Sequence, residues 1–120
     1  MSKSEGSEVT SSAAPVQRIL AEVASYYRIE LPVLLGRDRT QRVAVARMTA
    51  MHFMRSLLGF SFPRIGMIFH RHYSTVIYSC KRVEKRAERA PNLKRELARL
   101  AEKTRTAIAG LAAMQGDNSI

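Results

Sequence analysis

A chain of 120 residues, 46% of them hydrophobic, is large enough to bury one small core but not two. Its 20 lysines and arginines against 10 acidic residues give a net charge of +10, which predicts a polyanionic partner: nucleic acid first, an acidic membrane surface or acidic protein second. The single cysteine, Cys80, excludes an internal disulfide framework and a multi-cysteine zinc site, and no apolar run approaches the roughly 20 residues of a membrane span.

The chain begins with a stretch that is poor in large apolar residues. Residues 1–14 are rich in serine, threonine, glutamate and alanine, which predicts a disordered tail. They lack the apolar core of a secretory signal, so we expect a cytoplasmic protein. We expect the folded domain to span residues 15–113 and residues 114–120 to fray. At the start of this domain, apolar residues recur at three- and four-residue intervals and predict a helix over 16–27.

A basic loop separates the next two predicted helices. A short helical turn is expected at 31–35, where Gly36 stops it. The basic loop, RDRTQR at 37–42, then carries three arginines and one aspartate. Apolar residues at helical spacing predict the following helix over 43–58, with Gly59 as its C-cap.

Three further helices are predicted after Gly59. Ser61 is a good N-cap for a short helix over 62–69, because its side-chain oxygen can accept from the first turn. After a polar break at 70–73, Ser74 is the expected N-cap of a longer helix that ends near residue 89.

The last predicted helix covers 93–111 and follows Pro91, which interrupts the preceding one. No segment alternates with the period of a strand. The predicted fold class is therefore all-α.

The positive charge is concentrated in the middle of the chain. Residues 1–36 carry 3 cations and 4 acids, residues 37–89 carry 12 and 3, and residues 90–120 carry 5 and 3. The surplus lies on the basic loop and on the helices around the polar break, so this is the part that we expect to meet a polyanion.

The short helix, the polar break and the longer helix have the pattern of a helix-turn-helix, whose second helix enters the major groove of DNA by its first turns. Val76, Cys80 and Val83 are expected to face inward, which leaves hydroxyl residues on the exposed side. The candidate DNA contacts on this helix are Ser74, Thr75, Tyr78, Ser79 and, toward the flanking backbone, Arg82.

Three segments in this order resemble the C-terminal DNA-binding domain of the bacterial chromosomal replication initiator DnaA. They are VASYYRIELPVLLGRDR at 23–39, VAVARMTAMHFMRSLLGFSFPRIGMIF at 43–69 and HYSTVIYSCKRVEKR at 72–86. The resemblance implies a small helical domain with a Trp-repressor-like helix-turn-helix, here followed by a long C-terminal helix. It also implies double-stranded DNA as the partner and a role in replication initiation or its regulation.

The resemblance also implies which residues meet DNA. In that family the basic loop reaches the minor groove, an arginine of the next helix contacts DNA, and four residues at the turn read bases in the major groove. By position these contacts correspond to Arg37, Arg39, Gln41 and Arg42 in the loop, Arg47 in the helix, and His72, Tyr73, Ser74 and Thr75 at the turn, preceded by Arg71. The family has aspartate where His72 stands, and a charged histidine does not accept from cytosine N4, so whether the family's preferred sequence is retained stays open.

Catalytic chemistry is not indicated. The sequence has no paired carboxylates, no nucleophile triad and no GxxxxGK[ST] phosphate loop, so we expect no enzyme, no cofactor and no ATP-driven remodelling of an origin. A metal site at His52, His70, His72 and Cys80 is disfavoured, because the helix stripe turns Cys80 inward. The expected partner remains DNA, in the nucleoid and not at a membrane.

Two rival functions stay open beside a sequence-preferring DNA binder. The first is a protein-interaction regulator of the replication initiator or of its inactivation machinery, with secondary DNA contact. The second is nonspecific attachment to the nucleoid or to a membrane through charge. Selection of bound duplexes from a random pool separates them, because only the sequence-preferring binder enriches a motif. The sequence does not indicate the oligomeric state.

Overall fold

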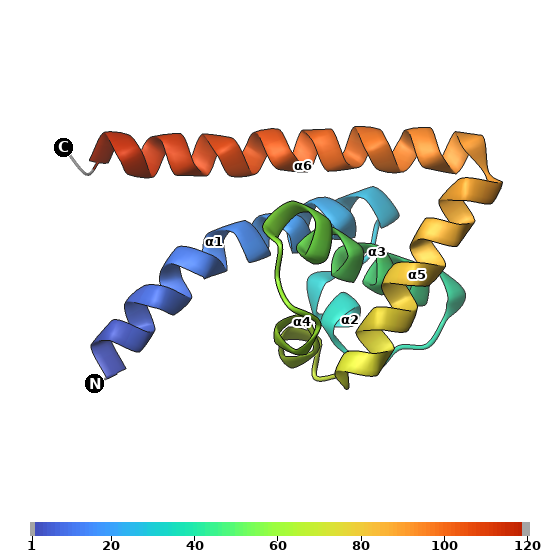
Figure 1. Cartoon of the computed structure of the whole chain (residues 1–120), viewed down its shortest axis with the longest axis horizontal. Helices are drawn as coiled ribbons and strands as arrows, with labels where there is room; N and C mark the ends of the chain where they lie inside the picture. The colour runs from blue at the N-terminus through green and yellow to red at the C-terminus, as the bar shows by residue number, and fades with distance from the viewer. Residues whose placement is uncertain (1, 119–120) are drawn as a thin grey trace.

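The computed structural model describes residues 2–118 and forms them into helices joined by short connections. In chain order the helices are α1 (Ser2–Tyr27), α2 (Leu31–Leu35), α3 (Gln41–Leu58), α4 (Phe62–Phe69), α5 (Tyr73–Arg89) and α6 (Pro91–Asn118). No strand occurs within this part of the chain, and the all-α prediction is confirmed. Figure 1 shows α6 across one side of the molecule and the α4–α5 turn on the opposite side, with α3 between them.

Helix α3 forms the centre of the hydrophobic core. Its residues Ala46, Ala50, Phe53 and Met54 are each at most 1% exposed. The fully buried side chains that close around α3 come from four other helices: Ile19, Val23, Leu34, Phe69 and Val76. Burial of each large apolar side chain stabilises the fold by about 1.5–3 kcal/mol, so α4 and α5 are held against α3 by their own apolar stripes.

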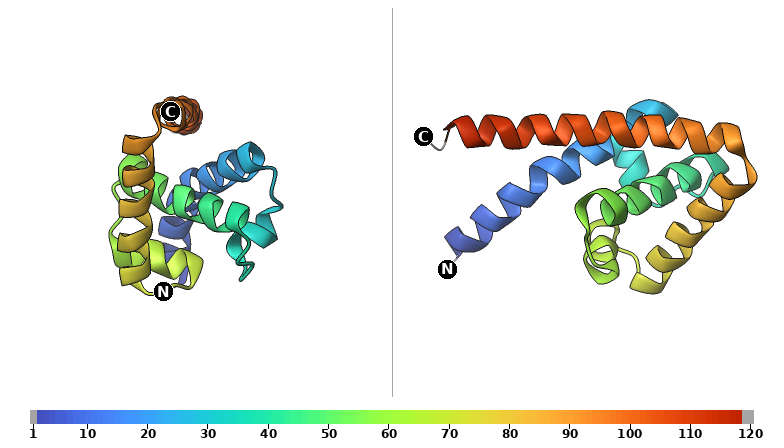
Figure 2. Two further views of the ribbon diagram at one scale, coloured as in Figure 1. Left: turned by 90° about the vertical axis from the view of Figure 1, so that its right-hand side faces the viewer. Right: turned by 45° about the horizontal axis from the view of Figure 1, so that its top comes forward.

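The two terminal helices are longer than the sequence predicts. Helix α1 begins at Ser2 and passes through Pro15, although residues 1–14 were expected to form a tail, and α6 covers 91–118 in place of the expected 93–111. Among the side chains that the structure describes, packing against the core extends from Val16 to Ile108. The outer parts of both helices project from the same side of the molecule (Figures 1 and 2). The boundaries of the folded domain at 15 and 113 therefore stay a prediction.

No helix within residues 2–118 is both long enough and apolar enough to cross a bilayer. The longest helix, α6, carries charged side chains along its exposed face, and its apolar stripe packs on α1 and α5.

Several helix ends follow the expected capping chemistry. The Ser61 side-chain oxygen accepts from the backbone N–H of Arg64 at 3.3 Å, which confirms Ser61 as the N-cap of α4. Gly59 ends α3 in the left-handed conformation, with φ 69°, as predicted. The predicted cap of α5 was wrong, because that helix begins at Tyr73 and its N-cap is His72 in place of Ser74.

Candidate nucleic-acid interface

Helices α4 and α5 are joined by a turn of three residues that brings the two backbones very close. The Arg71 N–H donates to the Gly66 carbonyl at 2.8 Å, and a Cβ on Gly66 would lie only 2.4 Å from the Arg71 carbonyl oxygen. A side chain at position 66 therefore has no room. The sequence did not identify Gly66 as special, because an isolated glycine within a helical pattern is tolerated and does not by itself indicate a close backbone approach.

Helix α5 divides into a buried and an exposed face. Val76 is fully buried, Cys80 and Val83 are at most 6% exposed, and Ser74, Thr75 and Tyr78 face solvent, as predicted. Ser79 was predicted to be exposed and is not, because it is only 4% accessible. It lies three residues after Val76, and residues at that spacing share one face of a helix. Ser79 is therefore removed from the candidate contacts.

The side chain of His72 caps the start of α5, and this fixes which of its ring nitrogens accepts a hydrogen bond. Its Nδ1 accepts from the Ser74 backbone N–H at 3.1 Å and lies 2.8 Å from the Ser74 hydroxyl. Because an accepting Nδ1 carries no proton, the neutral ring carries its proton on Nε2. The ring also stacks on Tyr73, with 4.4 Å between centroids. The exposed His72 ring thus presents an N–H donor outward.

The basic loop is shaped by a short hydrogen-bonded turn. One carboxylate oxygen of Asp38 accepts from the Thr40 backbone N–H at 2.8 Å and from its hydroxyl at 2.7 Å. These two bonds, the hydroxyl bond first, lower the pKa of Asp38, and nearby arginine charges add to the shift. Arg37 and Arg39 are exposed on this turn.

The last two residues of the basic loop, Gln41 and Arg42, are also exposed, but they lie on the first turn of α3, because that helix begins two residues before the predicted position 43. All four loop candidates therefore reach solvent.

Arg47 is buried and bound to the backbone, with only 8% of the residue exposed. Its Nε donates to the Leu34 carbonyl at 2.9 Å, Nη1 to the Asp38 carbonyl at 3.1 Å and Nη2 to the Val33 carbonyl at 3.3 Å. Val33 and Leu34 belong to the last turn of α2, whose carbonyls have no partner within the helix. Arg47, expected as a direct DNA contact, thus fastens the end of α2 to the start of the basic loop.

Arg71 ties the helix-turn-helix to the same segment. Its Nη1 donates to the Phe69 carbonyl at 2.8 Å, and its Nη2 donates to the Gly36 carbonyl at 3.0 Å. Burial lowers the pKa of Arg47, and the neighbouring charge of Arg71 lowers it further. The two arginines therefore hold the basic loop beside the α4–α5 turn.

A line of cations continues along α5, and we name these residues the basic stripe: Lys81, Arg82, Lys85, Arg86 and Arg89. Together with Tyr78 they line a groove of about 370 Å³. Arg82 Nη1 lies 3.5 Å from the Tyr78 hydroxyl, which places one of the predicted contacts beside another. The spacing of these residues repeats every three or four positions, so they share one face of the helix.

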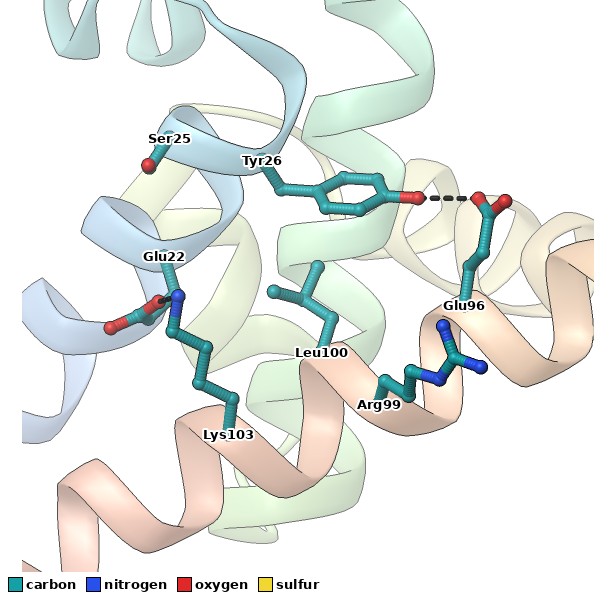
Figure 3. Close-up of a pocket in the computed structure, with 7 residues that line it drawn as sticks. All are labelled: Glu22, Ser25, Tyr26, Glu96, Arg99, Leu100 and Lys103. Carbon is teal, nitrogen blue, oxygen red and sulfur yellow. Dashed lines mark hydrogen bonds and ion pairs between the residues drawn. The ribbon is translucent and has the colours of Figure 1, made fainter.

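The charges of a second cavity, between α1 and α6, compensate one another. Figure 3 shows Lys103 reaching toward Glu22 and the Tyr26 hydroxyl bonded to Glu96. The Lys103–Glu22 distance is 3.6 Å, and the Glu96 bond is the main cause that raises the pKa of Tyr26 to about 12. Because acids and bases alternate there, this cavity of about 210 Å³ has no surplus of positive charge.

Within residues 2–118, no group of three or more histidine, cysteine, aspartate or glutamate side chains gathers in a way that could hold a metal ion.

Known proteins are similar to this chain over the part that contains the basic loop and the α4–α5 turn. Residues 16–83 match the family described as the bacterial dnaA protein helix-turn-helix. Chromosomal replication initiator protein DnaA 2 of Chlamydia trachomatis is 34% identical over 83 residues, which are 69% of this chain and 18% of that protein. Chromosomal replication initiator protein DnaA of Acinetobacter baumannii is 42% identical over 83 residues, 68% of this chain and 17% of that protein. The chain thus spans less than a fifth of these curated relatives.

A solved structure shows the same similarity. A crystal structure described as that of a DNA replication initiation factor superposes with a TM-score of 0.72 and 27% sequence identity, over 79% of this chain and 29% of that one. The resemblance inferred from sequence motifs is confirmed by these matches.

Proposed function

This chain belongs to the family of the bacterial DnaA helix-turn-helix, and on that premise we propose that it is a sequence-preferring double-stranded DNA-binding protein that acts in replication initiation or its regulation. The proposed binding needs no cofactor. It places the protein on the bacterial nucleoid.

One observation carries the proposal: the exposed first turn of α5 and the exposed arginines of the basic loop are fastened side by side. The bond from Arg71 to the Gly36 carbonyl joins them across 35 positions of sequence. In this proposal Ser74, Thr75 and Tyr78 contact base edges or phosphates in the major groove, while Arg37 and Arg39 enter the adjacent minor groove. The cations of the basic stripe contact flanking phosphates.

The electrostatic part is tested by salt titration of duplex binding. If about six phosphates are neutralised, the logarithm of the affinity falls with the logarithm of salt concentration with a slope near −5. Arg37→Ala should reduce that slope by about 1, whereas Arg99→Ala, on α6 at the opposite side of the molecule, should leave it unchanged. Absence of duplex binding at low salt rejects the proposal.

The sequence preference is tested through His72. Since its outward group is the Nε2–H donor, the base edge that it meets must offer an acceptor, as guanine O6 and N7 do and cytosine N4 does not. Duplexes selected from a random pool should enrich an acceptor edge at one position. His72→Asp keeps an N-cap but presents an acceptor, so its pool should enrich cytosine at that position. Identical pools for the two proteins contradict the assignment.

A second candidate function is regulation by contact with the replication initiator or with its regulators. The observation that favours it is an apolar cavity of about 420 Å³ between α3, α5 and α6, with Leu97 and Ala98 on its wall and Glu84, Glu88 and Lys94 at its charged rim. Purified initiator should then bind this chain without DNA, and Ala98→Arg should block the binding. Persistence of binding in the Ala98→Arg variant rejects this candidate.

A further inference from the structure

The apolar cavity of about 420 Å³ lies where α5 and α6 diverge, with α3 at its base. Ala90 alone connects α5 to α6, and the two helices spread apart from this corner (Figure 1). Four apolar residues that line the cavity remain at least partly accessible to solvent: Leu57, Ala87, Ala98 and Ala101. Contact of such a surface with water costs free energy, so the cavity favours an occupant with an apolar face.

The two helical walls of the apolar cavity carry opposite charges. The α5 wall bears Glu84 and Glu88, and the α6 wall bears Lys94 and Arg105. Glu84 already lies 3.8 Å from the His52 ring, but neither Glu88 nor Lys94 has an ion-pair partner among the described residues. An occupant that brings a base to the α5 wall and an acid to the α6 wall compensates these charges. A second copy of this chain carries both.

The solvent-accessible residues of α6 in the cavity are arranged symmetrically along the helix. They are Lys94, Ala98, Ala101 and Arg105, which share one face and lie evenly about the midpoint between the two alanines. When two such helices cross antiparallel at this midpoint, Ala98 of each copy meets Ala101 of the other, as a two-fold axis requires. Small side chains at the crossing allow the helix axes to approach to about 8 Å.

The ends of such a contact are balanced in charge. Lys94 of one copy comes beside Arg105 of the other, but each base brings an acid with it. Glu88 accompanies Lys94 on the cavity wall, and Glu102 is bonded to Arg105 within α6. Each end therefore holds two acids and two bases. Across the interface, the unpaired Glu88 gains Arg105 of the second copy as its partner.

We propose that the apolar cavity binds a second copy of this chain through an antiparallel contact between the two α6 helices. The inference goes beyond the proposed function and does not depend on DNA binding. It favours a second copy over the replication initiator, because this chain itself carries the complementary charges in a symmetric register. The α4–α5 turn lies on the side away from α6 (Figure 1), so both copies keep this turn free, and the dimer holds a duplex with two sites bivalently.

Dimerisation is tested by sedimentation velocity on the full chain after nuclease treatment. The natural protein should pass from monomer to dimer between about 1 and about 500 µM, because a contact made by one helix pair is small for a stable interface. Ala98→Arg should weaken the association at least about tenfold, because a long charged side chain then stands where two alanines meet. A chain that stays monomeric throughout overturns the proposal, and so does a dimer that Ala98→Arg leaves unchanged.

Mixing of two charge variants tests the antiparallel register. Glu88→Arg and Arg105→Glu should each weaken self-association, because each places like charges at both ends of the contact. In the mixed dimer every end again joins one arginine to one glutamate, so the mixture should associate although neither variant does so alone. Glu30→Arg makes the matched change outside the cavity and should dimerise as the natural protein does. Absence of the mixed dimer overturns the proposed contact.

The purified replication initiator is the alternative occupant. If this chain is monomeric and Ala98→Arg blocks its binding to the initiator, the cavity belongs to the initiator and the proposal of a second copy is overturned. Duplex affinity should be the same for the natural protein and Ala98→Arg at concentrations where both are monomeric. Loss of duplex binding therefore rejects the proposed function alone, while loss of self-association rejects the dimer alone.

Discussion

At the scale of single residues, the arginines of this protein divide into those that hold backbone and those that face solvent. Arg47 binds carbonyls 9 to 14 positions away, and Arg71 binds one 35 positions away. Arg37 and Arg39 are exposed. The family resemblance implied that all four would meet DNA, but the local sequence carries no mark of such distant carbonyl partners, so it did not separate the two roles.

Removal of the Arg47 side chain should destabilise the protein as well as weaken DNA binding. Arg47→Ala leaves three backbone carbonyls without a charged donor, which should lower the free energy of unfolding by about 3 kcal/mol. Urea unfolding followed by circular dichroism measures this. Arg99→Ala removes an exposed arginine of α6 and should change the stability by less than about 0.5 kcal/mol. Equal losses in the two variants contradict the clamp.

His70 holds a backbone conformation that suits glycine better. It ends α4 with φ 56°, in the left-handed region that costs a residue with a Cβ about 1–2 kcal/mol. His70→Gly removes this strain at a smaller entropic cost, so it should raise the free energy of unfolding by about 0.5–1 kcal/mol. The matched Ser56→Gly, at an exposed position within α3, should lower it by a similar amount. Thermal unfolding should therefore show shifts of opposite sign for the two variants.

At the scale of elements, the α4–α5 turn depends on the missing side chain of Gly66. In Gly66→Ala the new Cβ meets the Arg71 carbonyl, which is backbone and cannot rotate away, so the turn must open. We expect a loss of about 2 kcal/mol in stability and faster hydrogen exchange at the Arg71 amide. Gly110→Ala in α6, where a Cβ meets nothing within 4 Å, should be neutral or stabilising by up to about 1 kcal/mol. Unchanged exchange at Arg71 in Gly66→Ala contradicts this account.

The helices themselves were largely predictable, and their ends less so. Apolar spacing predicted the longer helices, because each buries one apolar stripe in the core, and the short turn at 31–35 was predicted from its stop at Gly36. Ser61 and Gly59 marked helix ends by local chemistry. The cap of α5 was missed because a histidine side chain took the place expected of Ser74. Burial of Ser79 was missed because a polar residue on an apolar stripe is buried by its neighbours and not by its own hydrophobicity.

At the scale of the whole molecule, charge is separated between two sides. The α4–α5 turn lies on the side away from α6 (Figures 1 and 2), and the segment 37–89, with its 12 cations and 3 acids, supplies that turn and the basic stripe. Helices α1 and α6 instead pair acids with bases, as Glu22 does with Lys103. The side with the α4–α5 turn and the basic stripe is therefore suited to bind a polyanion. On the side of α1 and α6, the paired charges contribute to packing between the helices.

The fold should also lose stability on mild acidification, through His52 at the junction of α3, α5 and α6. Burial lowers the pKa of His52, and the Glu84 carboxylate, 3.8 Å from Nε2, only partly offsets that effect. Its Nδ1 is buried without a hydrogen-bond partner among the described residues. A lowered pKa means that the folded state favours the neutral ring, so the contribution of His52 is fully present above the unfolded pKa of about 6.5 and is lost as the pH falls through the folded value.

Thermal unfolding between pH 7.5 and pH 5 tests this linkage. The melting temperature of the natural protein should fall over that window, and His52→Gln, which has no titrating ring, should remove most of the fall. Glu84→Gln should steepen it, because loss of the carboxylate lowers the pKa of His52 further. The two variants thus move the pH dependence in opposite directions although both remove an ionisable group, and a change in net charge alone cannot produce that pattern. Parallel pH profiles for all three proteins contradict the role assigned to His52.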